Sequence, residues 1–404
     1  MARKKRTDNK GYVLHTGEYQ GKSGRYSFKY TQNGKRYTVY GLTLKELREK
    51  EKQIEKDLED GIDNSRRNIT LNQLFQEYLE LKTDLKESTR CNYLASWNNA
   101  IRDSDIGKMK VSEIDQICIR KFYAGLVKQG LAANTIKFYH SLICPALELA
   151  VDSNMIRKNP AKDARKGIGG TKKEKSSITI SQQEKLLEFA KNNSQYCIYH
   201  PLMIFALSTA LRVGELTGLR WSDVDLKENI IHIRQQLIYR NLGDGCRFHV
   251  QDLKTEAGRR DIPLTASARK SLIRQKELSL LLGTKQKKEI DGITDFVFLN
   301  SLGNPYATNA INFILKNMID AYNRAEREAA GREKREAEPL PHISAHILRH
   351  TACTRLAESG IDPKTLQYIM GHSSIAVTMD IYNHVDTVRV KNEMEKAEDV
   401  IKYG

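Results

Sequence analysis

The sequence has few of the features that would place a chain in a membrane, in a disulfide framework or around a structural metal. No apolar run approaches the roughly 20 residues of a membrane-spanning helix, and the first residues, MARKKRT, lack the apolar core of a signal peptide. His346 and His350 have the spacing of two zinc ligands, but Ile347 replaces the glutamate of an HExxH motif and no third ligand is evident. The six cysteines are scattered without a CxxC pair, at positions 91, 118, 144, 197, 246 and 353. We therefore expect a soluble, cytoplasmic chain with reduced thiols, no metal and no cofactor.

Positive charge dominates the composition. The 404 residues include 66 Lys and Arg against 50 Asp and Glu, which gives a formal net charge of +16. Such an excess predicts a polyanionic partner, because it raises affinity and association rate without reading sequence. Since no membrane segment accompanies the charge, nucleic acid is the favoured partner. The length predicts two to four domains.

The first 42 residues are the most basic part of the chain, with ten Lys and Arg against two acidic residues. Residues 25–30 and 35–40 alternate as strands do, and Asn33-Gly34 between them is a strong hairpin signal. Residues 11–14 are a candidate third strand. The pattern predicts a small, basic, three-stranded sheet.

A helix is expected to follow this sheet. Thr43 and Glu46 have the spacing of a capping box, which predicts a helix to about Asp60. A small sheet backed by one helix can enter the DNA major groove, although a sheet with solvated lysines would show the same pattern. The charge density favours DNA binding. The candidate DNA contacts are Arg25, Tyr26, Phe28, Lys29, Lys35, Arg36 and Tyr37.

The middle of the chain is predicted to be all-helical. Between candidate linkers at 61–68 and 162–177, apolar periodicity and capping signals predict four helices, at 70–81, 88–103, 111–129 and 133–152. Any small helical domain would show this periodicity. The position of the segment, between the basic N-terminal part and the last part of the chain, is therefore stronger evidence for its role than the pattern itself. Candidate phosphate or base contacts are Thr89, Arg90, Asn134 and Lys137.

The last part of the chain, from about residue 178, mixes helices with short strands. Ser181 and Glu184 predict a capped helix to about Asn193, and the apolar run 202–207 predicts a buried helix leading to Arg212. The expected strands are 230–233, 248–254 and 260–264, followed by helices and a highly charged surface piece at 324–338. A mainly helical domain with a small antiparallel sheet follows from this pattern.

Residues 345–351, AHILRHT, place His346 and Arg349 three residues apart, on one face of a helix. Two donors on one face, one of them a planar and permanent cation, suit the oxygens of a phosphodiester. Cutting a phosphodiester without a metal needs a nucleophile, charge relief on the non-bridging oxygens and a proton for the leaving oxygen. The sequence offers candidates for each, with His372 and Tyr382 downstream of this helix.

Together with residues 209–221, TALRVGELTGLRW, these motifs resemble the two signature boxes of the tyrosine recombinases, the phage-type integrases. Over essentially the whole chain the resemblance is to integrases of conjugative transposons. It implies a multidomain α+β tyrosine recombinase fold in three parts. These are an arm-type DNA-binding domain at 1–62, a helical core-binding domain at 69–161 and a catalytic domain at 178–404.

The resemblance also implies catalytic roles. Tyr382 would be the nucleophile, forming a 3′-phosphotyrosyl link and leaving a 5′-hydroxyl, so that religation needs neither ATP nor metal. Arg212 and Arg349 would clamp the scissile phosphate, while His346 donates to it or takes the tyrosine proton. His372 would donate to the transition state, and Lys254, between two strands, would protonate the leaving oxygen. Glu215 fits a structural partner for arginine or backbone groups better than an acid.

The implied partners are double-stranded DNA with core-type and arm-type sites, three further copies of the chain in a homotetramer, and an accessory DNA-bending or excision factor. Strand exchange would pass through a Holliday junction, during integration or excision of a mobile element in a bacterial nucleoid. Residues 383–404 extend past Tyr382 and include a helix-like piece at 387–401, which either docks on a neighbouring protomer or packs on its own chain. Two rival interpretations are a type IB topoisomerase and a DNA-binding regulator on a degenerate recombinase scaffold.

Overall fold

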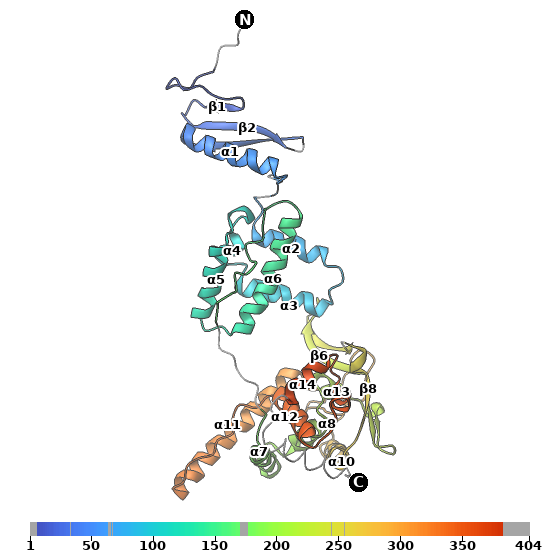
Figure 1. Ribbon diagram of the computed structural model, residues 1–404. Helices are drawn as coiled ribbons and strands as arrows, with labels where there is room; N and C mark the ends of the chain where they lie inside the picture. The colour runs from blue at the N-terminus through green and yellow to red at the C-terminus, as the bar shows by residue number, and fades with distance from the viewer. Residues whose placement is uncertain are drawn as a thin grey trace, which may run out of the picture. The chain divides into compact units, whose positions relative to one another are not determined.

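The computed structural model describes residues 6–32, 34–63, 66, 68–169, 177–243, 245–253 and 255–382. The chain divides into two compact units, residues 1–173 and 174–404, drawn in Figure 1. Within the described ranges, no helix is long and apolar enough to cross a membrane. The predictions for Lys254, for the linker residues 170–176 and for the tail 383–404 concern residues outside the described ranges.

The first unit begins with an antiparallel sheet in the order β1-β2-β3, formed by β1 (Glu18–Gln20), β2 (Tyr26–Gln32) and β3 (Lys35–Gly41). The β2–β3 hairpin pairs Tyr30 with Tyr37, and Gly34 in its turn has a φ of +75°, as the hairpin signal predicts. The third strand was predicted wrongly. Residues 11–14 contribute only a single bridge, Thr7 to Val13, while the three-residue strand β1 pairs with β2 instead.

Helix α1 (Leu44–Glu59) packs against β2 and β3 (Figure 1). Its N-cap is the predicted Thr43, whose hydroxyl accepts from Glu46 N at 3.1 Å, and Glu46 in turn accepts from the amide of Leu42 at 2.9 Å. Because side chains alternate along a strand, Tyr26 and Phe28 share the sheet face that is partly buried, whereas Lys29 lies on the exposed face. The sheet therefore offers one face to the helix and the other to solvent.

The helical part of this unit contains α2 (Leu71–Leu81), α3 (Glu87–Ala100), α4 (Asp105–Lys108), the 3₁₀ turn η1 (Val111–Glu113), α5 (Gln116–Lys128) and α6 (Ala133–Asp152). The four predicted helices are confirmed, with two differences, one of which is that the short helix α4 was not predicted. Residues 111–115 are not the start of the third helix, because Asp115 caps α5 by accepting from Cys118 N at 2.7 Å. In the core, Trp97 stacks on Phe75 with ring centroids 3.7 Å apart and donates to Asn72 at 2.8 Å.

The helices of the second unit are α7 (Ile180–Asn192), α8 (His200–Thr209), α9 (Val213–Thr217), α10 (Ala266–Leu281), α11 (Thr308–Glu333), α12 (Ala345–Glu358), α13 (Pro363–Met370) and α14 (Ile375–Tyr382). The 3₁₀ turns are η2 (Cys197–Tyr199), η3 (Trp221–Asp223) and η4 (Glu256–Gly258). Helix α7 begins earlier than predicted, because its capping box is formed by Thr179 and Gln182 rather than by Ser181 and Glu184. The charged end of α11 extends away from the other helices of this unit (Figure 1).

Two small antiparallel sheets accompany these helices. One has the order β4-β5-β8, with β4 (Val224–Asp225), β5 (Ile230–Ile233) and β8 (Arg260–Pro263), and the other pairs β6 (Gln235–Asn241) with β7 (Cys246–Asp252). The strands β5, β7 and β8 were predicted from the sequence, whereas β4 and β6 were not. The core of the unit lies between the first sheet and the helices, where α8 contacts both α10 and α12.

Candidate active site

The turn at the end of α8 positions Arg212 and also binds Arg349. Helix α8 ends at Thr209, and Ala210 adopts a left-handed conformation with a φ of 52°, which turns the chain so that Arg212 becomes the N-cap of α9. Arg349 lies on the buried face of α12, where that helix packs on α8. Its Nη1 donates to the carbonyl of Ala210 at 2.7 Å, so the turn that presents one arginine also binds the other.

The C-terminus of α13 gathers three arginines that are far apart in sequence. The last carbonyls of a helix have no partner within the helix and carry the negative end of its dipole, so cations are stabilised there. Here three successive carbonyls each accept from a different guanidinium. The bonds run from Arg260 Nε to Ile369 O (2.7 Å), from Arg349 Nη2 to Met370 O (2.7 Å) and from Arg212 Nη2 to Gly371 O (2.6 Å).

Glu215 is the carboxylate at the centre of this cluster and is only 2 % exposed. Its oxygens accept from Arg212 Nη1 at 2.7 Å and from Arg260 Nη2 at 2.9 Å, and Arg349 Nη1 lies 4.0 Å away. Burial opposes ionisation of Glu215, but the hydrogen bonds and charges of Arg260 and Arg212 outweigh it and hold the pKa of Glu215 below its usual value. The expected structural role of Glu215 agrees with these contacts.

Burial, followed by the charge of Arg212, lowers the pKa of Arg349 to about 10, which still leaves it a cation at neutral pH. Three guanidinium groups around one carboxylate leave the cluster with a net charge of about +2. A surplus of positive charge next to the surface is suited to an anion such as a phosphodiester.

Gly371 ends α13 with a φ of +60°, in the left-handed region that favours glycine. A Cβ at this position would lie 2.9 Å from Arg260 Nη1 and 3.1 Å from the carbonyl of Ala257. Both the conformation and the close approach of the guanidinium therefore require glycine before His372. These two constraints explain why a glycine directly precedes His372.

His372 connects the arginines with the following helix. Its Nε2 lies 3.1 Å from Arg349 Nη2 and its Nδ1 lies 3.0 Å from the buried hydroxyl of Thr378 in α14. Because a guanidinium can only donate, Nε2 must accept here and the ring must be neutral, with its proton on Nδ1. Burial, followed by the charges of Arg349 and Arg212, lowers the pKa of His372 to about 4, which agrees with a neutral ring.

His346 and Tyr382 complete the described candidates. His346 lies in the first turn of α12, exposed and one helical turn before Arg349. Tyr382, the last residue of α14, packs in a cluster with Ala210 and Met370, two residues whose carbonyls bind Arg349. Its phenol donates to the carbonyl of Ile361. Five of the six candidates are thus placed in the same unit, and Lys254 falls in the connection from β7 to β8, outside the described residues.

Sequence reasoning did not identify Arg260. Its side chain is fully buried, and it joins Glu215 to the end of α13. The strand pattern could have identified it. Arg260 and Ile262 alternate with Asp261 and therefore share the face of β8 that points into the core. An arginine at an inward-facing strand position requires a partner, since charged groups are buried only when they are paired.

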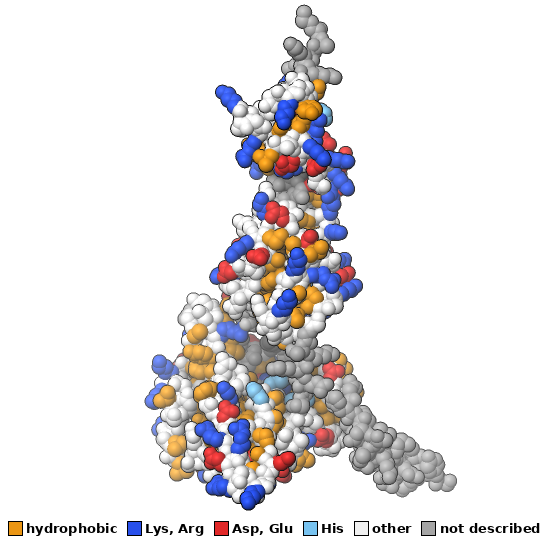
Figure 2. All heavy atoms as spheres, turned by 90° about the vertical axis from the view of Figure 1, so that its left-hand side faces the viewer, with side chains coloured by type: hydrophobic (Ala, Val, Ile, Leu, Met, Phe, Trp, Pro, Cys, Tyr) orange, Lys and Arg blue, Asp and Glu red, His pale blue; other side chains and the backbone are white. Residues whose placement is uncertain are grey.

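The candidate DNA contacts of the N-terminal sheet divide between its two faces. Tyr26 is 5 % exposed and donates to Asp8 at 2.7 Å, so it belongs to the packing of the domain. Phe28 and Tyr37 lie on the same partly buried face and flank Tyr30, with centroids 6.0 and 5.5 Å from its ring. The exposed candidates are Arg25, Lys29, Lys35 and Arg36. Lys and Arg side chains are spread over this part of the chain on the face shown in Figure 2.

The four candidates of the helical part lie in the first two turns of α3 and α6. These helices contact each other through Tyr93 and Phe138, whose rings meet edge to face at 6.0 Å. Asn134 and Lys137 are exposed, whereas Thr89 and Arg90 are half-buried and Arg90 donates to the carbonyl of Leu79 at 3.2 Å. The contact between the two rings brings the first halves of α3 and α6 together, and all four candidates lie in those halves.

One group of side chains in the described residues has the composition of a metal site. The possible ligand atoms of His15, Glu18 and Glu51 all lie within 4.8 Å of one another. However, both oxygens of Glu18 already accept from Arg48, at 2.9 and 3.2 Å, so a guanidinium stands where a cation would bind. Burial, followed by the charge of Glu18, raises the pKa of Glu51 to about 7. A buried ion pair with a neighbouring carboxylic acid accounts for the group without a metal.

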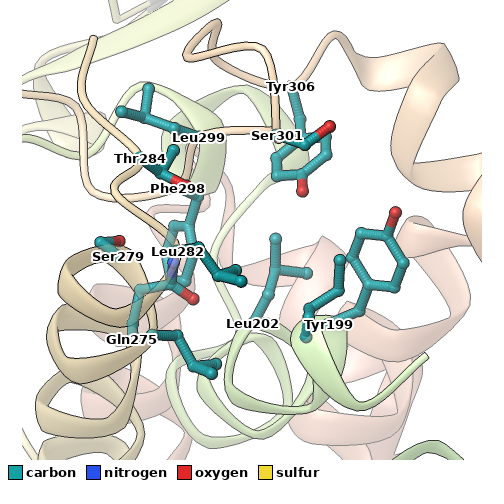
Figure 3. Close-up of a pocket in the computed structure, with 12 residues that line it drawn as sticks. Tyr199, Leu202, Gln275, Ser279, Leu282, Thr284, Phe298, Leu299, Ser301 and Tyr306 are labelled. Carbon is teal, nitrogen blue, oxygen red and sulfur yellow. The ribbon is translucent and has the colours of Figure 1, made fainter. Parts of the chain in front are cut away.

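Figure 3 shows a small cavity in the second unit, of about 40 Å³, and none of the residues that line it is a candidate catalytic residue. Leu202 of α8, Leu282 and Phe298 line it, and the rings of Tyr199 and Tyr306 meet edge to face at 6.2 Å. Its lining contains no charged side chain. The cavity therefore cannot neutralise a phosphate and is part of the packing of α8 against α10.

Comparison with known proteins agrees with this arrangement. Residues 176–389 match the phage integrase family, residues 2–58 match the DNA-binding domain of Tn916 integrase, and residues 70–127 match the N-terminal SAM-like domain of phage integrases. The transposase of Tn1545 from Streptococcus agalactiae is 32 % identical over 97 % of this chain and 96 % of its own length. The transposase of Tn916 from Enterococcus faecalis is 31 % identical with the same coverage.

Solved structures support the same relationship. The Tn1549 transposon integrase in complex with a circular intermediate DNA superposes with a TM-score of 0.72 at 26 % identity, over 81 % of this chain and 99 % of that one. A λ integrase tetramer bound to a Holliday junction has a TM-score of 0.56 at 20 % identity, over 90 % and 94 % of the two chains, and shares the fold. The chain therefore belongs to the phage integrase family of tyrosine recombinases, enzymes that cleave and rejoin DNA.

Proposed function

We propose that this chain is the integrase of a conjugative transposon and that it cuts DNA with Tyr382, without a metal. The observation that carries the proposal is the arginine cluster at the end of α13, where Arg212 and Arg349 are held by the carbonyls of two successive residues. Because these bonds exist before DNA arrives, the clamp is preorganised and needs little rearrangement when it binds a phosphate. The strong similarity to the Tn1545 and Tn916 transposases supports the choice of element.

In the proposed mechanism, the scissile phosphate binds between Arg212 and the first turn of α12. Among the described residues, Arg212 uses two of its five donors, and its side chain is 41 % exposed, so other donors can reach a non-bridging oxygen. Buried Arg349 supplies positive charge that stabilises the phosphate. Exposed His346 donates a hydrogen bond to the phosphate or accepts the phenol proton. In its neutral form His372 orients Arg349, and it can donate to the phosphate only after its Nε2 gains a proton.

Tyr382 would attack the phosphorus in line with the leaving 5′ oxygen. Its phenol must first leave the carbonyl of Ile361. The attack forms a 3′-phosphotyrosyl bond and breaks the phosphorus–oxygen bond to the 5′ side, where Lys254 supplies the proton. Attack by the 5′-hydroxyl of another strand then reverses these steps and rejoins the DNA, so no external energy source is required.

The three matched segments support a proposed division into an arm-binding domain at 1–62, a core-binding domain at 69–161 and a catalytic domain at 178–404. Recombination joins two duplex sites, and each site is cut on both strands. With one nucleophile per chain, this requires four protomers, which exchange strands in pairs through a Holliday junction. We further propose that an accessory DNA-bending or excision factor sets the direction, and that the enzyme acts on the bacterial nucleoid.

A type IB topoisomerase would use the same chemistry as a monomer, without pairing two sites. The separate basic sheet and the full-length similarity to transposases favour the recombinase. A DNA-binding regulator that had lost catalysis would not need the arginine cluster at the end of α13. In this chain Arg212, Arg260 and Arg349 each keep their bond to that helix end.

The chemistry is tested by trapping the protein on a nicked suicide DNA that carries the end of the element, in the presence of a chelator. We expect the wild-type chain to form an SDS-resistant adduct and Tyr382→Phe to form none, because the phenol oxygen is the atom that bonds to phosphorus. Equal adducts from both proteins would assign the nucleophile to another residue. Tight binding without any adduct would favour the regulator.

The proposed DNA-binding face of the N-terminal sheet makes a separate prediction. Lys29→Glu and Arg36→Glu, on the exposed face, should each weaken binding to arm-type DNA roughly tenfold at physiological salt and reduce its salt dependence. Lys52→Glu, which makes the same charge change on α1, is the matched control and should have a smaller effect. Fluorescence anisotropy at several salt concentrations measures both quantities, and equal losses from all three variants would reject the assignment of the face.

A further inference from the structure

We propose that Arg260 is a positioning residue for strand cleavage, which sets the pose of the two clamp arginines through Glu215 and the end of α13. This inference rests on the proposed function, because it concerns how the same clamp is built. Arg260 lies on β8, on a different element from every candidate catalytic residue, and its side chain is 0 % exposed. It therefore cannot touch DNA itself.

The guanidinium of Arg260 makes contacts in three directions. Its Nε donates to the carbonyl of Ile369 at 2.7 Å, and Nη1 donates to the carbonyl of Gly258 at 2.8 Å. Toward Glu215 it forms a fork, with Nη2 2.9 Å from Oε2 and Nη1 3.3 Å from Oε1. A planar fork fixes both the position and the rotation of the carboxylate, which a single-point donor such as lysine cannot do.

Glu215 transmits this geometry to Arg212. The oxygen Oε1 accepts from Arg212 Nη1 at 2.7 Å and the oxygen Oε2 accepts from the backbone N of Arg212 at 3.0 Å. Each carboxylate oxygen is thus shared between Arg260 on one side and Arg212 on the other. Without Arg260, the carboxylate would lose the bonds that oppose its rotation toward Arg212, and the clamp would lose its fixed orientation.

The second connection runs through α13. Arg260 binds the carbonyl of Ile369, and the next two carbonyls bind Arg349 and Arg212. These three carbonyls belong to one helix end, so their spacing is set by the backbone. Holding the first of them therefore places the acceptors of both clamp arginines. The absence of a side chain at Gly371 allows this approach, as its Cβ would collide with Arg260 Nη1.

A test must separate positioning of the clamp from general support of the fold. We therefore compare a suicide DNA with a normal scissile phosphodiester and one with a methylphosphonate at the same position. In the methylphosphonate a methyl group replaces one charged oxygen, so the linkage is neutral and depends much less on the charge of a correctly posed clamp. A variant with a general folding defect would lose activity on both DNAs alike.

The variants of the full-length chain are Arg260→Gln, which removes the charge and the fork, and Arg260→Lys, which keeps the charge. Arg220→Gln is the matched control, because Arg220 also forms an ion pair, with Asp295 at 2.9 Å, but outside the cluster. We expect Arg260→Gln to slow single-turnover cleavage of the phosphodiester roughly 100-fold and of the methylphosphonate less than about fivefold. Arg260→Lys should lie between, and DNA affinity should stay within about twofold because Arg260 is buried.

Each other outcome has a definite meaning. Full-rate cleavage by Arg260→Gln, or equal losses on the two DNAs, would overturn the positioning role while leaving the proposed function intact. If Arg260→Gln does not fold, Arg260→Lys gives the same comparison. If the wild-type chain forms no adduct on either DNA, the proposed function itself fails, and the inference fails with it.

Discussion

Glu215→Gln should lower the free energy of unfolding of the catalytic unit by about 3–5 kcal/mol, the usual cost of removing one partner from a buried ion pair. Glu215 is 2 % exposed and is the carboxylate shared by Arg212 and Arg260, with Arg349 at 4.0 Å. The amide would leave the buried guanidinium groups without a counter-charge. Its NH₂ group would also point a donor at groups that can only donate.

Urea denaturation followed by circular dichroism measures this loss in the full-length chain. Glu358→Gln is the matched control, because Glu358 pairs with Arg355 at 2.6 Å on the surface, with its side chain 52 % exposed. An exposed pair of this kind contributes only about 0–1 kcal/mol. Similar small losses from both variants would show that the cluster does not depend on its central carboxylate.

Arg349→Gln should reduce strand cleavage roughly 1000-fold while the chain still binds DNA, because a preorganised positive charge next to the transition state is lost. The arginine also satisfies two buried carbonyls, those of Ala210 and Met370. Some loss of stability is therefore expected, of about 1–3 kcal/mol for each acceptor left without a partner. The rate should be measured under single-turnover conditions at a temperature where the variant remains folded.

Arg355→Lys, on the same helix, is the control for this variant. Arg355 donates to the carbonyl of Ile178 at 2.8 Å, away from the cluster, so its replacement should change the cleavage rate by less than about tenfold. A similar cleavage rate for Arg349→Gln and the wild type, with a folded protein, would remove Arg349 from the clamp.

Local sequence patterns predicted most of the helices because capping residues and apolar periodicity act within a few residues. The capping box of α2 and the hairpin around Gly34 are of this kind. The strands β1 and β4 have only three and two residues, too few to show an alternation, and β1 is defined by its pairing with β2 instead. The strand β6 was not predicted from the sequence. In the structure its residue Leu237 is buried.

The candidate site could be predicted as a set of residue types but not as a network. The motifs identified Arg212, Arg349 and His372, whereas the bonds from them to the end of α13 depend on the tertiary fold. The alternation along β2 could have separated packing residues from DNA-binding candidates. Its aromatic residues lie two positions apart and therefore share the packed face of the sheet. Applied to β8, the same rule identifies Arg260 as an inward-facing charge.

The proposed function depends above all on Tyr382 becoming covalently linked to DNA without a metal. Its most direct test is to isolate the adduct formed on suicide DNA in a chelator, digest the protein and the DNA, and identify the nucleotide-bearing peptide by mass spectrometry. We expect a peptide that contains Tyr382, linked to the 3′ phosphate of the cleaved strand, with a hydroxyl on the other 5′ end. A link to another residue, a 5′-phosphate on the released strand, or an adduct that requires added metal would contradict it.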